Sequence, residues 1–278
     1  MHFSTAQTMT IDAFLPLARM TDDAVLEASK IYQSAKPFPH IVFDNFFDPA
    51  LLDQILAEFP ASDKIKWQRF DNAQEIKLAS SAEESFGPMT RLFLYHLNCI
   101  TFLNFIGQVT GIDNLLPDPC FDGGGLHQIQ RGGKLGIHVD YNKHRRYGLD
   151  RRLNLICYLN KDWQEDYGGH IELWDRDMKN CEAKVLPVFN RVLVFGTSSY
   201  TYHGHPNPLN CPDDRSRKSL ALYYFSNGRP AEETTGEHST LFQARSEQDF
   251  QPTVPQRLRA LAHDILPPLI TRKFEKNQ

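Results

Sequence analysis

The sequence predicts an α+β fold in which a β-rich core, a jelly roll by its strand pattern, carries flanking helices on its N-terminal side. Beyond residue 120, short β-prone runs alternate with Gly, Pro, Asn and Asp at the spacing of a sandwich or barrel. Before residue 120, apolar residues recur mainly at helical spacing. The length of 278 residues suits one integrated domain with helical additions.

The N-terminal part, residues 1–119, is expected to be largely helical and to pack on the core. Residues 10–35 predict a helix, and residues 37–47 form a short β-prone run. The segment 49–60 has a proline in its first turn and apolar residues at helical spacing. Residues 88–110 are apolar nearly all round, which predicts one or two buried helices behind a sheet.

The catalytic core is expected over residues 120–228, followed by an extension over 229–278 that becomes partly helical at PQRLRALAHDIL, residues 255–266. The expected core strands are GLHQIQ (125–130), KLGIHVDY (134–141), RLNLICYLN (152–160), GGHIELWD (168–175), KVLPVFNRVLVFG (184–196), SYTYHGH (199–205) and KSLALYYFS (218–226).

Composition narrows the function classes. The net charge of −4 argues against a general nucleic-acid binder, which is expected to be basic. The five cysteines are odd in number and none is spaced as CxxC, so a reducing compartment is expected. We see neither a signal-peptide pattern nor an apolar run long enough to span a bilayer. These features predict a cytoplasmic protein with no membrane or nucleic-acid partner.

The stretch GIHVDYNKH places His138 and Asp140 two residues apart in an expected strand. Residues i and i+2 of a strand point to the same face, so the two side chains project together. A third ligand from a distant strand would complete the 2-His-1-carboxylate triad of non-haem Fe(II) oxygenases. His203 and His205, which follow a well-formed apolar strand, are the candidates. The alternative is a chance HxD tripeptide.

A second constellation lies in the last expected strand, where Arg217, Ser219, Ala221 and Tyr223 share one face. A guanidinium beside a hydroxyl and small side chains suits a dicarboxylate, because arginine can grip a carboxylate with two hydrogen bonds. The alternative interpretation is that Arg217 is an ordinary surface ion-pair partner.

Taken together, these elements make the chain resemble the Fe(II)/2-oxoglutarate-dependent dioxygenases, in particular the prolyl-4-hydroxylase-like branch. The resemblance covers about residues 120–227. Its elements, in order, are His138-x-Asp140, YLNKDW (158–163), Gly168-Gly169, the strand ending at Phe195, a histidine eight residues later, and Arg217-x-Ser219 leading into LALYYF. The resemblance implies a double-stranded β-helix with iron inside one mouth.

The resemblance also implies roles for individual residues. His138, Asp140 and a downstream histidine would hold iron, and His203 fits the family spacing better than His205, which is expected to line the mouth. Arg217 would pair with the far carboxylate of 2-oxoglutarate, and Ser219 would assist. The resemblance implies two further roles. Tyr158 would make a second contact to that carboxylate, and Gln128 would face the cofactor.

The implied activity is hydroxylation of an unactivated C–H bond with Fe(II), 2-oxoglutarate and O2, with ascorbate as an aid that keeps iron reduced. Because Asp140 supplies a carboxylate where halogenases of the superfamily have a small residue, hydroxylation is favoured over halogenation. The expected substrate is a small molecule, such as an amino acid, sugar or secondary metabolite. The alternatives are a prolyl or other protein side chain and, third, a non-catalytic jelly-roll binding module.

The basic run NKHRRYGLDRR, residues 142–152, holds five Lys or Arg residues against one Asp. Because the run directly follows the expected metal pair, it could form a basic rim that attracts an anionic substrate. The alternative is a solvated loop whose charges pair with acidic neighbours.

Overall fold

The computed structural model describes residues 13–246 and 249–251. Its four α-helices in this range are α1 (Asp22–Ser34), α2 (Pro49–Glu58), α3 (Pro88–Leu97) and α4 (Ile100–Thr110). The strands of the same range are β1 (His40–Asp44), β2 (Gln68–Asp71), β3 (Glu75–Ser80), β4 (Gly125–Gln130), β5 (Lys134–Val139), β6 (Asp150–Tyr158), β7 (Ile171–Trp174), β8 (Cys181–Val185), β9 (Arg191–Gly196), β10 (His203–His205), β11 (Ser216–Ser226) and β12 (Leu241–Phe242).

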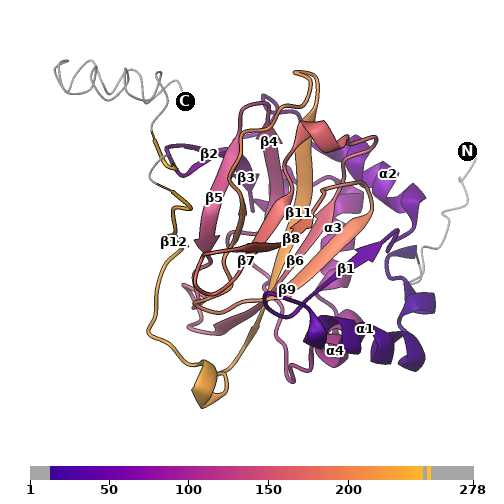
Figure 1. The fold of residues 1–278 in the computed structure, drawn as a ribbon. Helices are drawn as coiled ribbons and strands as arrows, with labels where there is room; N and C mark the ends of the chain where they lie inside the picture. The colour runs from indigo at the N-terminus through magenta and orange to yellow at the C-terminus, as the bar shows by residue number, and fades with distance from the viewer. Residues whose placement is uncertain (1–12, 247–248, 252–278) are drawn as a thin grey trace, which may run out of the picture.

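Among the described residues these strands form one barrel-like antiparallel sheet in the order β1-β9-β6-β11-β4-β3-β5-β10-β7-β8, with β2 paired to β3 and β12 to β5. The helices lie to one side of this sheet, away from β5 and β12 (Figure 1). The structure is therefore the double-stranded β-helix with flanking N-terminal helices that the sequence predicts. Residues 184–196, expected as one strand, form β8 and β9 with a turn around Asn190.

The N-terminal part is less helical than expected, because it also contributes β1, β2 and β3 to the sheet. β1 pairs with β9 along its whole length, from His40 opposite Phe195 to Asp44 opposite Arg191. β3 is short and polar, so its sequence alone does not favour a strand. It is held because it pairs with β4 at one end and β5 at the other, and so joins the two halves of the barrel.

The N-termini of α2 and α3 are stabilised by carboxylates. Asp48 caps α2, since its Oδ1 accepts a hydrogen bond of 2.8 Å from the backbone N–H of Ala50. The Glu58 carboxylate at the end of α2 accepts from the backbone N–H groups of Met89 and Thr90 at 3.0 Å. A negative charge at a helix N-terminus is favourable, so this contact fixes α3 against α2.

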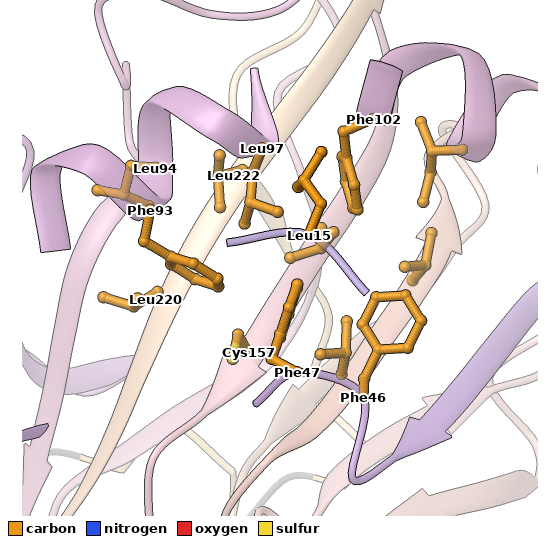
Figure 2. Packing of buried hydrophobic residues seen from close by; sticks show 14 of the residues in the cluster. Leu15, Phe46, Phe47, Phe93, Leu94, Leu97, Phe102, Cys157, Leu220 and Leu222 are labelled. Atoms are coloured by element: carbon orange, nitrogen blue, oxygen red, sulfur yellow. The ribbon is translucent and has the colours of Figure 1, made fainter. Parts of the chain in front are cut away.

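The main hydrophobic core lies between these helices and the outer face of the sheet. Figure 2 shows Leu220 of β11 beside Phe93 of α3, and the same buried cluster includes Leu222 of β11 and Phe102 of α4. Because strand residues alternate between faces, the packing of Leu220 and Leu222 outward directs the odd-numbered residues of β11 into the barrel. The helical layer therefore sets which β11 side chains reach the site.

The C-terminal extension returns to the barrel, where β12 pairs with β5 and places Phe242 opposite His138. The helix expected at residues 255–266 lies outside the described residues. Within the described part, no single helix is long and apolar enough to cross a membrane, although α3 and α4 together, bent by 52°, pass by length and composition.

Candidate metal and cosubstrate site

Three predicted ligands meet inside the barrel. β5 and β10 are antiparallel neighbours with His203 directly opposite His138, and Asp140 follows β5 by one residue. The ligand atoms of the three side chains all lie within 4.8 Å of one another. His138 Nε2 is 3.6 Å from Asp140 Oδ1, and His203 Nε2 is 3.3 Å from Asp140 Oδ2. The structure thus brings together His138, Asp140 and His203, the set predicted from the strand face and the family spacing.

The orientation of both imidazoles fits a metal. His138 Nδ1 lies 2.8 Å from the carbonyl oxygen of Gly136, and His203 Nδ1 lies 2.9 Å from that of Thr201. Each Nδ1–H is thereby donated to the backbone, which leaves the Nε2 lone pair free toward Asp140. Two imidazole nitrogens and one carboxylate that occupy one face of a metal ion are the donor set of non-haem Fe(II) oxygenases. The residues present therefore fit iron.

Two glycines in the ligand strands allow close packing, and one of them, Gly204, allows the two strands to approach each other. A Cβ at Gly204 would lie 2.6 Å from the carbonyl oxygen of Gly136 and 2.8 Å from that of Leu135. A Cβ at Gly136 would lie 2.5 Å from Phe250 and 3.0 Å from the carbonyl oxygen of Gln74. The atoms that face Gly204 belong to the backbone of β5, so a side chain there would push the two histidine strands apart. A side chain at Gly136 would instead displace the Phe250 ring and press on the Gln74 carbonyl.

The Asp140 carboxylate is held by groups from β6. Asn154 Nδ2 donates to Asp140 Oδ2 at 2.7 Å, and Arg151 Nη2 lies 3.1 Å from the same oxygen. Burial raises the pKa of Asp140, but the Arg151 charge and the two histidines outweigh it and hold that pKa well below its ordinary value. Arg145 and Arg146 of the same basic run are exposed and do not contact Asp140.

Arg151 is itself fixed by aromatic rings. Its guanidinium carbon lies 3.5 Å from the ring centroid of Tyr223 and 4.5 Å from that of Tyr141. The two phenol groups donate to the backbone carbonyls of Asp122 and Gly123. Arg151 is only 1% exposed. Two tyrosine rings therefore enclose Arg151, the partner of the expected metal ligand Asp140. The sequence did not predict this arrangement, because Arg151 lies in a run expected to be a loop.

Arg217 lies on the inner face of β11, as the strand pattern predicts. Its Nε donates to the Gly169 carbonyl at 2.9 Å, and its Nη2 donates to the Tyr158 hydroxyl at 3.3 Å. Burial lowers the pKa of Arg217 and raises that of Tyr158. Arg217 has no carboxylate partner among the described residues, although it is buried. A buried guanidinium without a counter-ion calls for an anionic ligand.

Ser219 and Gln128 differ in where they point. Ser219 is buried. It pairs across the sheet with Tyr158 on one side and His127 on the other, and it shares the inner face of β11 with Arg217. Gln128 is opposite Lys218, on the other face of β4, and donates to the Ser216 hydroxyl at 2.9 Å. Contrary to the expectation from spacing, it is His127 that faces the barrel interior. Burial, followed by the charge of Lys77, lowers the pKa of His127 to about 3.

His205 lies near Arg217 rather than within the ligand cluster. A bulge between His203 and His205 changes the pairing of β10 with β5. His205 is 3% exposed, and neither ring nitrogen has a hydrogen-bond partner among the described residues. Burial, and then the charges of Arg217, Lys77 and His138, hold the pKa of His205 well below its ordinary value.

The basic run 142–152 is mostly paired. Lys143 binds Asp150 at 2.9 Å, and Arg152 binds Glu233 at 3.1 Å, while Arg151 is committed to Asp140. The exposed charges of Arg145 and Arg146 remain at the surface. The run is therefore closer to a loop whose charges are paired than to a continuous basic rim.

Two nearby histidines lie outside the ligand cluster. His144 pairs with Asp118 at 3.3 Å, both of them buried, and so anchors the loop after Asp140. His170 pairs with Glu165 at 2.9 Å near the surface. Neither belongs to the ligand cluster found among the described residues.

Comparisons with known proteins agree with this geometry. Residues 124–225 match the model of the 2OG-Fe(II) oxygenase superfamily. The chain is 23% identical over 255 residues to a prolyl 3,4-dihydroxylase, OGFOD1, of Ostreococcus tauri, a match that covers 84% of this chain and 45% of that protein. It is 28% identical over 79 residues to the prolyl 3-hydroxylase OGFOD1 of Mus musculus, covering 27% of this chain and 14% of that protein. The chain thus spans less than half the length of these relatives.

Among solved structures, a prolyl-4-hydroxylase of Pseudomonas putida superposes with a TM-score of 0.50 at 16% identity. The match covers 72% of this chain and 100% of the other. At this identity the likeness concerns the fold.

Proposed function

Since residues 124–225 belong to the 2OG-Fe(II) oxygenase superfamily, in its prolyl hydroxylase-like branch, we propose that this oxygenase hydroxylates a prolyl side chain in a protein or peptide. The observation that carries the choice of substrate is that both curated relatives are named as prolyl hydroxylases. It favours the alternative from the sequence over the small-molecule substrate expected first. Retention of the ligand set and of Arg217 speaks against a binding module without catalysis.

The chain's own residues hold and orient the reactants. His138, Asp140 and His203 would hold Fe(II), and Arg217 with Tyr158 would hold the far carboxylate of 2-oxoglutarate. Iron with this cosubstrate and O2 supplies the oxidising chemistry, in which a substrate C–H becomes C–OH while 2-oxoglutarate becomes succinate and CO2. The Arg151–Asn154 pair keeps Asp140 ionised and fixed in orientation.

Aromatic rings shield the histidine ligands. The Phe195 ring centroid lies 4.6 Å from that of His203, and the Phe242 ring centroid lies 5.4 Å from that of His138. These apolar rings limit water around the site, which strengthens the electrostatic interactions inside it. They leave Asp140, whose side chain is 12% exposed, as the most accessible of the three ligands.

The test is a succinate-release assay with a proline-containing peptide library and, in parallel, a metabolite panel. We expect turnover with peptides, a product heavier by one oxygen atom, and loss of turnover when the responsive proline is replaced by alanine. Turnover confined to metabolites would overturn the peptide assignment. The same product mass is expected with chloride or bromide present, and a halogenated product would contradict hydroxylation.

We also propose a cytoplasmic location, which the five free cysteines support.

A further inference from the structure

His205 stands apart from every other buried polar side chain in the described part of the chain. Five described side chains have buried nitrogen or oxygen atoms without a hydrogen-bond partner, and His205 alone among them leaves two such atoms. A buried polar atom without a partner costs free energy, and native structures rarely keep one without a reason. The ring is therefore placed to meet a ligand.

The surroundings of His205 define the chemistry of that ligand. His205 and Gly169 both border one small cavity, which has a volume of about 80 Å³. The Gly169 carbonyl accepts from Arg217 Nε at 2.9 Å, so the guanidinium lies next to this glycine. The charges of Arg217 and Lys77 both act on the ring. Lys184 and the buried Glu172 also line the cavity. A ligand that meets both the imidazole and the guanidinium would accept hydrogen bonds and carry negative charge.

The hydrogen-bonding capacity of the neighbours leaves room for this role. Tyr158 accepts a hydrogen bond from Arg217, so its own hydroxyl proton is free to be donated. A carboxylate offers about four lone-pair sites, of which a bidentate guanidinium and one phenol hydroxyl fill about three. A buried imidazole N–H beside them supplies a further donor.

From this placement we propose that His205 donates a hydrogen bond to the far carboxylate of 2-oxoglutarate, together with Arg217 and Tyr158. Its role is to select a dicarboxylic keto acid, and it is not a metal ligand. The described donor cluster within 4.8 Å contains His138, Asp140 and His203, and His205 is outside it. The inference rests on 2-oxoglutarate as cosubstrate and is independent of the hydroxylated substrate.

The experiment measures binding rather than turnover. Protein loaded with Zn(II), which is redox-inert, is titrated calorimetrically with 2-oxoglutarate and with 2-oxopentanoate, which has the same carbon chain but lacks the far carboxylate. The unmodified protein is expected to prefer 2-oxoglutarate. His205→Leu should reduce that preference by about tenfold or more, the cost of one hydrogen bond to a charged group. His205→Asn, which retains a donor, should keep most of it.

His96→Leu is the matched control, because His96 lies on α3 in the helical layer outside the barrel, where its Nδ1 donates to the Leu92 carbonyl at 2.7 Å. It should leave both affinities unchanged. An equal loss for both keto acids, an unchanged preference, or a loss of Zn(II) binding in His205→Leu would each overturn the proposal. Should the leucine variant fail to fold, His205→Ala removes the donor without adding bulk, and the same ratio decides.

The outcomes separate this inference from the proposed function. Failure of the unmodified protein to bind 2-oxoglutarate would overturn the role of His205 together with the cosubstrate. Failure to hydroxylate any prolyl peptide would overturn only the peptide assignment, and the measured preference between the two keto acids would still decide the role of His205.

Discussion

Two buried arginines serve opposite ends of the site, and they differ in what neutralises them. Arg151 contacts the Asp140 carboxylate at 3.1 Å and lies between two tyrosine rings. Arg217 contacts a tyrosine hydroxyl and a carbonyl, with no carboxylate among the described residues. The difference teaches how to separate a structural charge from a binding charge. The charge of Arg151 is neutralised by a carboxylate of the chain itself, whereas the charge of Arg217 is neutralised only when an anionic ligand binds.

The largest expected effect tests the metal end, where Arg151 acts through Asp140. His138→Ala or His203→Ala should abolish iron binding, because the two remaining ligands are too few to hold the ion tightly. Calorimetric titration with Fe(II) under anaerobic conditions measures this. His205→Ala should retain iron affinity. If His205→Ala lost iron while His203→Ala kept it, the assignment of the third ligand would be wrong.

Arg217→Ala should weaken 2-oxoglutarate binding by roughly two to three orders of magnitude, since removing one partner of a buried carboxylate pair costs about 3 to 5 kcal/mol. The measurement is a 2-oxoglutarate titration of Zn(II)-loaded protein. Lys218→Ala is the control, because Lys218 lies on the other face of β11. Equal losses in the two variants would refute the assignment of inner and outer faces.

Arg151→Met should destabilise the metal-free protein by about 3 kcal/mol, because the Asp140 carboxylate stays buried and loses its charged partner. Urea unfolding monitored by fluorescence gives the free energy. The matched variant Arg217→Met should cost clearly less, because it leaves no carboxylate unpaired in the described structure. If the two variants were equally costly, the contrast between a paired and an unpaired arginine would fail.

The smallest effect concerns Asn154, which contributes one hydrogen bond to Asp140. Asn154→Ala should lower metal affinity by about tenfold, the lower end of what a partner of a metal ligand contributes. Competition with a metal chelator provides the measurement. Arg145→Ala, a change at an exposed position of the neighbouring loop, should leave metal affinity unchanged. A comparable loss in Arg145→Ala would assign the basic loop a role at the metal that its contacts do not show.

Strand alternation was sufficient to predict much of the site. His138 with Asp140, and Arg217 with Ser219, were each placed within one strand, where the face of residue i+2 follows from geometry. Gln128 was assigned from the family resemblance and not from strand alternation, and the turn at 131–133 separates it from His138. A turn does not preserve the alternation of faces from one strand to the next, so the inward position passed to His127.

Contacts between distant segments could not be predicted in this way. Arg151 was expected in a loop because its neighbours are basic, and only the pairing of β6 with β11 places it between Tyr141 and Tyr223. β3 was not expected at all, since its polar sequence becomes a strand only through pairing with β4 and β5. Both features depend on tertiary structure, which overrides local preference.

The pairing of β5 with β10 and β12 has a consequence for biosynthesis. Because β6, β7, β8 and β9 lie between the two histidine strands in the chain, a nascent polypeptide that has emerged only as far as β5 presents His138 and Asp140 without His203. Phe242, which covers His138, is synthesised later still. A ribosome-bound fragment therefore offers iron two ligands and an open face, and high-affinity loading must await the synthesis of β10.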